Sequence, residues 1–134
     1  MYQHITIVGR LGRDPEMRFT PNGQAVTSFN VATDRQWADA AGVKQKETTW
    51  FRVSVWGKQA ESTNQYLKKG SMVLVEGRMT PDPATGSPRI FKKQDGTEGA
   101  SFEIAASAVR FLSSKGEPIE DAPVFIASQD EIPF

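Results

Sequence analysis

The sequence predicts an all-β domain with one helix. Apolar and polar side chains alternate along most of residues 1–112, which is the period of a β-strand. Only one segment has a helical pattern, and strands are expected on both sides of it. Three strands, one helix and then further strands fit the OB-fold, a five-stranded Greek-key barrel with one helix. A β-sandwich is the structural alternative, but it would not require a helix at that place.

The first strand is expected over residues 2–13, where Ile7 and Leu11 share one side of the alternating pattern. Gly9 and Gly12 fall inside this segment. Glycine within a strand indicates a bend or a bulge, and a strongly coiled barrel strand needs such positions.

Three more segments follow before the helix. Residues 21–23 read Pro-Asn-Gly and predict a turn, after which residues 26–34 alternate as a second strand. Residues 37–44 contain Ala-Ala-Gly and are interpreted as a loop. The third strand is expected over residues 47–58, where the alternation is clear.

The helix is expected over residues 59–69. The side chains that share one face of it are Ala60, Thr63 and Leu67. Lys68 and Lys69 complement the negative end of the helix dipole, and Gly70 has the conformational freedom that the position after a helix requires.

The remaining strands form a hairpin region. A fourth strand is expected over residues 72–80. Residues 81–88 (PDPATGSP) cannot continue a strand ladder and predict a loop. Residues 89–93 and 101–111 then form two hairpin arms around an Asp-Gly turn at 95–96.

The charge of the chain is divided between its two parts. Residues 1–112 carry 15 Lys and Arg against 11 Asp and Glu, whereas residues 113–134 carry 1 Lys against 5 acids. There is no cysteine, which excludes disulfides and thiolate chemistry. The first residues lack a signal-peptide pattern, and no apolar run approaches the ~20 residues of a membrane span, so a cytoplasmic protein is expected.

The third strand carries the most informative side chains. Successive strand residues point to opposite sides, so the odd positions from Phe51 to Val55 form an apolar core face. Trp50, Arg52 and Trp56 lie on the other face. Tryptophan and arginine on a non-core face indicate either a subunit interface or a platform on which unpaired bases stack while arginine meets phosphate.

The same combination recurs in two other segments. Arg89, Phe91 and Lys93 share one face of a strand, and Trp37 lies in a polar segment after Arg35. This repetition favours the stacking interpretation. Further candidates for contacts with a nucleic-acid backbone, each also explained as a solvated charge, are Lys44, Lys46, Lys58, Lys68, Lys69 and Arg78.

Catalytic patterns are weak. His4 is the single histidine and has no partner chemistry nearby. No zinc-ligand spacing and no glycine-rich phosphate loop is present, so no metal or cofactor is expected. A nuclease built from scattered acids such as Asp14 and Glu16 is the weakest alternative.

The last residues form a distinct motif. Asp130 and Glu131 precede Ile132, Pro133 and Phe134. Pro133 resists helix and sheet, and a terminal phenylalanine with a carboxylate can enter an apolar pocket rimmed by cations. We expect three parts: a binding domain over 1–112, a flexible linker over 113–128 and an acidic partner-binding tip over 129–134. The alternatives are a solubility tail and a frayed end.

Three stretches resemble the bacterial single-stranded DNA-binding (SSB) proteins. They are ITIVGRLGRDPEMRFTPNGQAVTSFNVATDRQW, TTWFRVSVWGKQAESTNQYLKKGSMVLVEGRM and the terminal DEIPF. The resemblance implies an OB-fold homotetramer that protects single-stranded DNA in the nucleoid. It also implies that the tip recruits replication, recombination and repair proteins. The stacking residues that it implies are Trp37, Trp50, Trp56 and Phe91.

The resemblance also points to basic residues near the DNA, namely Lys58, Lys69 and Arg89, beside Arg52 and Lys93 from the strand pattern. The expected function is therefore sequence-independent binding without catalysis. The competing hypothesis is an interaction adaptor in which the aromatic residues form subunit interfaces and only DEIPF acts.

Overall fold

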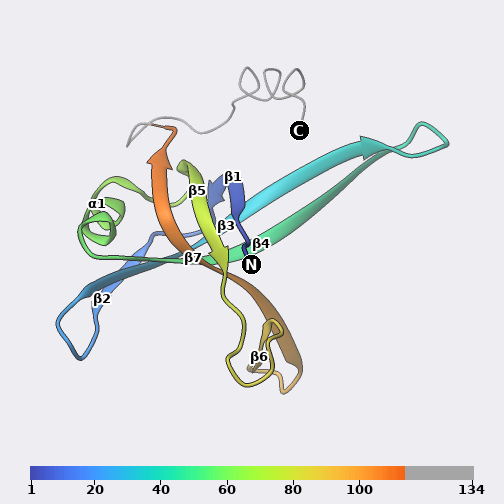
Figure 1. Ribbon diagram of the computed structural model, residues 1–134. Helices are drawn as coiled ribbons and strands as arrows, with labels where there is room; N and C mark the ends of the chain where they lie inside the picture. The colour runs from blue at the N-terminus through green and yellow to red at the C-terminus, as the bar shows by residue number, and fades with distance from the viewer. Residues whose placement is uncertain (114–134) are drawn as a thin grey trace.

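The computed structural model describes residues 1–113, and five of its strands close into a barrel (Figure 1). Around the barrel the order is β1-β5-β7-β4-β3, and β3 returns to pair with β1. These strands are β1 (Ile5–Leu11), β3 (Ala25–Ala38), β4 (Lys44–Trp56), β5 (Met72–Met79) and β7 (Glu98–Phe111). The predicted OB-fold is therefore confirmed, while the predicted disordered acidic tail lies outside the described residues.

Three shorter elements complete the fold. Helix α1 (Lys58–Tyr66) connects β4 to β5, as the sequence predicts. Strand β2 (Glu16–Phe19) pairs with the beginning of β3, and β6 (Arg89–Lys92) pairs with the beginning of β7. The sequence pattern did not predict β2, because its alternation covers only the four residues Glu16–Phe19, all of them exposed, and is too short to indicate a strand. Within residues 1–113, no helix is both long and apolar enough to span a membrane.

The core consists mainly of β-branched side chains. Val53 and Val55 of β4 are buried as predicted, and Val53 lies opposite Ile104 of β7 in a parallel pairing. Phe51, the third predicted member of this apolar face, is only half-buried. The buried side of β4 therefore fixes which of its residues point outward.

Two glycines allow barrel strands to approach closely. A Cβ atom on Gly9 would overlap the carbonyl oxygen of Ala32, and one on Gly77 would overlap the carbonyl oxygen of Ala105. Gly77 also lies at a register shift between β5 and β7. Gly9 agrees with the expectation that a coiled barrel strand needs glycine, whereas Gly77 was not predicted from the sequence.

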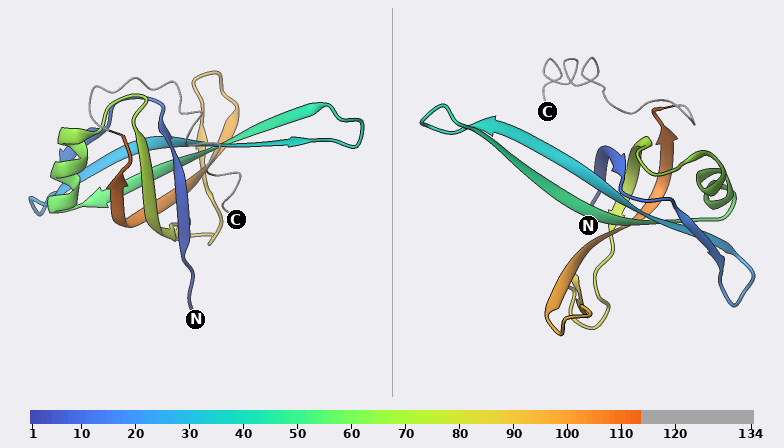
Figure 2. Two further views of the ribbon diagram at one scale, coloured as in Figure 1. Left: turned by 90° about the horizontal axis from the view of Figure 1, so that it is seen from above. Right: turned by 180° about the vertical axis from the view of Figure 1, so that it is seen from behind.

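The predicted loop over residues 37–44 is too long, because β3 continues to Ala38 and β4 begins at Lys44, so only residues 39–43 form the turn. Residues 34–48 thus form a two-stranded arm that extends away from the barrel, on the side opposite α1 (Figure 2). The Asp39 carboxylate closes its turn by accepting hydrogen bonds of 2.9 Å from the N–H groups of Ala41 and Val43. Trp37 consequently lies on a strand rather than in a loop.

The predicted helix end is also corrected. Helix α1 stops at Tyr66, and Leu67 is already extended. Lys68 and Lys69 therefore do not lie in the last turn, and Gly70, with φ of 88°, belongs to a separate turn. The chain leaves the helix early because the N–H of Gly70 donates to the carbonyl of Leu11, which ties this turn to β1.

Candidate functional site

One continuous face of the sheet β2-β3-β4-β7-β6 carries most of the candidate side chains. Strand pairing sets this face, because Arg52 lies opposite Asn30 on β3 and Glu103 on β7. Phe91 lies opposite Gly99 in the β6–β7 hairpin. We call this surface the outer face. Its members include Glu16, Arg18, Ser28, Asn30, Trp50, Arg52, Ser54, Trp56, Arg89, Phe91, Ser101 and Glu103.

The outer face is hollowed between β4 and β6. This Trp50–Phe91 hollow has a volume of about 530 Å³ and brings together Trp50, Arg52, Arg89 and Phe91. The sequence predicted each of these residues separately, and the structure joins them through the pairing of β4 with β7 and of β7 with β6. Other residues that line it, none of them predicted, are Arg13, Asn30, Phe51, Ala100, Ser101 and Glu103.

A glycine lies beneath each of the two aromatic rings. A Cβ atom on Gly12 would lie 2.6 Å from the six-membered ring of Trp50, and one on Gly99 would lie 2.9 Å from the ring of Phe91. Each ring therefore packs against backbone on one side. The two side chains are still 53% and 45% exposed, respectively, so each retains a solvent-facing surface suited to stacking.

Positive charge dominates the Trp50–Phe91 hollow. Three arginines line it against one carboxylate, that of Glu103. The Nε of Arg89 lies 3.2 Å from Glu103, whose carboxylate also accepts a hydrogen bond from Ser101. Within residues 1–113, Arg13 and Arg52 form no ion pair, so the hollow favours an anionic ligand.

Trp56 and Trp37 lie away from this hollow. Trp56 is on the outer face at the end of β4 and is 41% exposed. Trp37 follows the alternation of Val31 and Thr33, so it points to the opposite side of β3. The Arg35 guanidinium lies 4.1 Å from the centre of the Trp37 ring and is itself held by Glu47 at 2.8 Å.

The predicted lysines are distributed around the outer face. Lys58 is the first residue of α1, directly after Trp56 and Gly57. The backbone N–H of Lys69 donates to the carboxylate of Asp14 at 2.8 Å. The side chain of Lys93 lies beside Phe91, because both approach the position that a Cβ of Gly99 would occupy.

Two turn carboxylates have a lowered pKa. The pKa of Asp39 is lowered mainly by the hydrogen bond from the N–H of Val43, and that of Asp95 mainly by the hydroxyl of Thr97. Both serve hairpin turns rather than chemistry. Residues 1–113 contain no cluster of three or more His, Cys, Asp or Glu side chains that could hold a metal ion. The outer face can therefore stack planar groups and attract anions.

Comparisons with known proteins match most of the chain to one family. The family model described as the single-strand binding protein family matches residues 2–112. The single-stranded DNA-binding protein of Neisseria meningitidis serogroup B is 39% identical over 119 residues, which are 89% of this chain and 64% of that protein. Its counterpart from Oceanobacillus iheyensis is 40% identical over 116 residues, covering 87% and 66%, respectively. The chain thus spans slightly less than two thirds of these relatives.

A solved structure supports the fold. The chain described as "Plasmodium falciparum SSB complex with ssDNA" matches 84% of this chain and 97% of its own length, with a TM-score of 0.68 and 24% sequence identity. At 24% identity this likeness shows the fold alone.

Proposed function

Because the chain belongs to the single-strand binding protein family, we propose that it binds single-stranded DNA along the outer face without catalysing a reaction. The observation that carries this proposal is the Trp50–Phe91 hollow, where two half-exposed rings and the guanidinium groups of Arg52 and Arg89 lie together. The relatives named above are single-stranded DNA-binding proteins, which agrees with a binding rather than a catalytic role.

Stacking supplies affinity that does not depend on sequence. Trp50 and Phe91 stack bases in the hollow, and Trp56 extends the platform along β4. Trp37 points to the other side of β3, outside the outer face, and offers a separate ring surface that Arg35 does not cover. Each stacked base contributes about 1–3 kcal/mol, and every base has a face that can stack. The protein therefore accepts any unpaired sequence.

Cations hold the phosphates. Arg52 and Arg89 lie beside the rings, and Lys58, Lys69 and Lys93 border the outer face. Binding at these residues releases counterions from the strand, so affinity falls as salt rises.

A fluorescence titration tests the proposal. Oligo-dT should quench the tryptophan emission stoichiometrically, and Trp50→Leu should reduce both the quench and the affinity. Tyr66→Leu is the matched control, because Tyr66 is an exposed aromatic residue on α1, outside the outer face. Loss of the oligonucleotide on adding a divalent metal would point to a nuclease, and an unchanged emission would reject the proposal.

The terminal residues carry a second role in this proposal. The tip, residues 129–134, recruits proteins of replication, recombination and repair, and residues 113–128 link it to the binding domain. The support is the motif itself, in which two acids precede Ile132, Pro133 and Phe134.

Deleting Ile132–Phe134 should abolish the capture of these partners and leave the affinity for single-stranded DNA equal or slightly higher, because the acidic tail competes weakly with DNA for the basic domain. A pull-down and a dT titration of the same deletion variant check both parts. A large loss of DNA affinity would contradict this division of roles.

The family resemblance also suggests a homotetramer, and β1 offers an edge for assembly. Residues Ile5–Arg10 pair with β5, but only Arg10 and Leu11 pair with β3, so most of the second edge of β1 has no strand partner within residues 1–113. An open edge can pair with another copy of the chain. Sedimentation equilibrium would show four chains per particle if this part of the proposal is right, and a monomer if it is wrong.

A further inference from the structure

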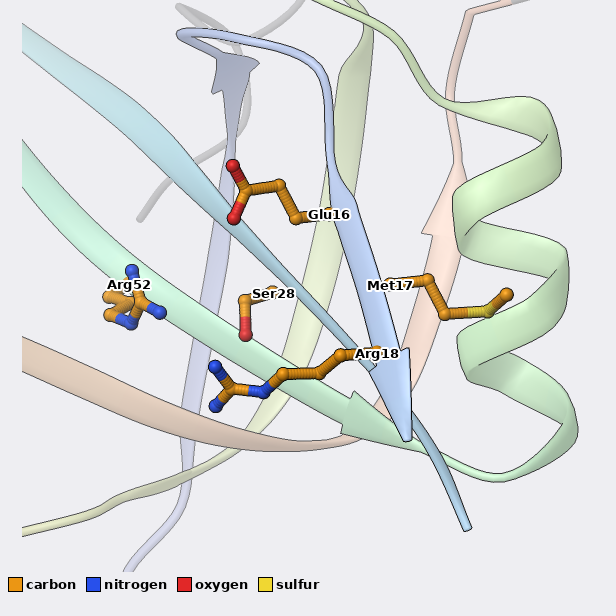
Figure 3. Close-up of a pocket in the computed structure, with 5 residues that line it drawn as sticks. All are labelled: Glu16, Met17, Arg18, Ser28 and Arg52. Carbon is orange, nitrogen blue, oxygen red and sulfur yellow. The ribbon is translucent and has the colours of Figure 1, made fainter. Parts of the chain in front are cut away.

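The outer face continues beyond the Trp50–Phe91 hollow toward β2. A second depression of about 350 Å³, the Arg18–Arg52 hollow, is lined by Glu16, Met17, Arg18, Ser28 and Arg52. Figure 3 shows the Arg18 side chain extending from β2 toward the side on which Arg52 lies, with the hydroxyl of Ser28 beside the space that separates the two guanidinium groups. Arg52 lines both hollows, so the two depressions adjoin on one surface.

Strand pairing explains why these groups converge. Glu16 lies opposite Ser28, and Arg18 lies opposite Val26, which in turn pairs with Trp56 on β4. Arg18 is therefore beside the Trp56 end of the platform. Met17 points to the other side of β2, toward α1, which leaves its two neighbours facing the hollow (Figure 3). The small side chain of Ser28 leaves space between the two arginines.

Among residues 1–113, the two guanidinium groups have no anionic partner of their own. Arg35, Lys46 and Arg89 each form an ion pair with a carboxylate. Within the described part of the chain, Arg18 and Arg52 form none, although Glu16 lines the same hollow. Two unpaired arginines directed at one space form a site for an anion, and guanidinium suits the oxygens of a phosphate.

The distance between Trp50 and Trp56 along β4 indicates which anion would occupy the Arg18–Arg52 hollow. Trp50 and Trp56 are six residues apart on the same side of a strand, which corresponds to roughly 20 Å at ~3.3 Å per residue. A DNA strand that stacks on both rings must pass its phosphates over Arg52 and the adjacent hollow. On the basis of the proposed function, we propose that Arg18 and Arg52 together hold a phosphate of the bound strand between Trp50 and Trp56, and that Glu16 weakens this site by repulsion.

Substitutions at Arg18 and Glu16 test the site, because they should change the affinity for oligo-dT in opposite directions. Arg18→Gln should weaken the binding of oligo-dT by roughly three- to tenfold, and should make the slope of log affinity against log salt shallower by about 0.7, the value for one phosphate contact on a single strand. Arg18→Lys should retain the slope, because it keeps the charge. Glu16→Gln should bind more tightly than the unaltered protein.

Arg110→Gln is the matched control, because Arg110 is an exposed arginine near the end of β7, outside the outer face. It should bind like the unaltered protein, and thermal unfolding should confirm that all variants are folded. If Arg18→Gln has the same affinity and salt slope as Arg110→Gln while the unaltered protein binds oligo-dT, the phosphate site is rejected and the proposed function stands. If the unaltered protein does not bind oligo-dT, both fail.

Discussion

Two glycines set the positions of two aromatic rings at the outer face. Gly12 follows β1 and lies under Trp50, whereas Gly99 is on β7 and lies under Phe91. Neither contact is local, since Gly12 and Trp50 are separated by the whole of β2 and β3. The alternation along β4 showed that Trp50 points outward. Gly12 was interpreted as a bend, because the pattern along one strand does not show which side chains from other strands pack against it.

Gly12→Ala should displace the Trp50 ring, because the new Cβ would lie 2.6 Å from it. The ring is half-exposed and can move, so the stability should change little while the affinity for oligo-dT decreases. The indole N–H resonance of Trp50 reports the displacement. Gly99→Ala is the control, as it should displace Phe91 and leave this resonance in place. An unmoved Trp50 resonance in Gly12→Ala would refute the role of Gly12.

The β3–β4 arm shows that contacts between paired strands determine where a strand ends. The Ala-Ala-Gly run at residues 40–42 predicted a loop over residues 37–44, yet the chain forms strands up to Ala38 and again from Lys44. The reason is pairing across the arm, where Arg35 contacts Glu47 and Thr48 donates to Asp34 at 2.7 Å. Cross-strand pairs of this kind become visible only when the register is known.

Asp39→Ala should loosen the tip of the arm by removing the acceptor for the N–H groups of Ala41 and Val43. Acid should act in the same way. The pKa of Asp39 lies below its ordinary value of 3.8, so its contribution is present above that pH and is lost as the pH falls through the lowered pKa. Amide exchange at Ala41 and Val43 measures both effects.

Asp95→Ala provides the reciprocal control for this prediction. It should increase exchange at Thr97, whose N–H donates to Asp95 at 2.9 Å, and leave the arm unaffected. Equal exchange at Val43 in Asp39→Ala and in the unaltered protein would show that the carboxylate does not hold the turn.

The close contact between β5 and β7 at Gly77 should make this position sensitive to substitution. Gly77→Ala should lower the free energy of unfolding by about 1–3 kcal/mol, because the added Cβ meets the backbone of Ala105, which cannot move without distorting the barrel. Gly99→Ala meets only flexible side chains and should cost much less. Urea unfolding compares the two. A Gly77→Ala protein as stable as Gly99→Ala would mean that the strands can separate freely at this point.

At the scale of the molecule, one face unites residues that are far apart in the chain. The sequence identified three segments that combine basic and aromatic residues and predicted an all-β fold with one helix, and the fold prediction is confirmed. It did not show that Arg52 would meet Glu103 and Arg89, because the parallel pairing of β4 with β7 joins segments about fifty residues apart. It also missed β2, and with it Arg18, because an alternation of four exposed residues is too short to indicate a strand.

Chemical-shift mapping with oligo-dT tests the location of the DNA most directly. We expect the largest changes on the outer face, at the indole of Trp50 and the amides of Asn30, Arg52 and Ser101, while residues of α1 such as Ser62 change little. Changes centred on α1, or no changes at saturating oligo-dT, would contradict it.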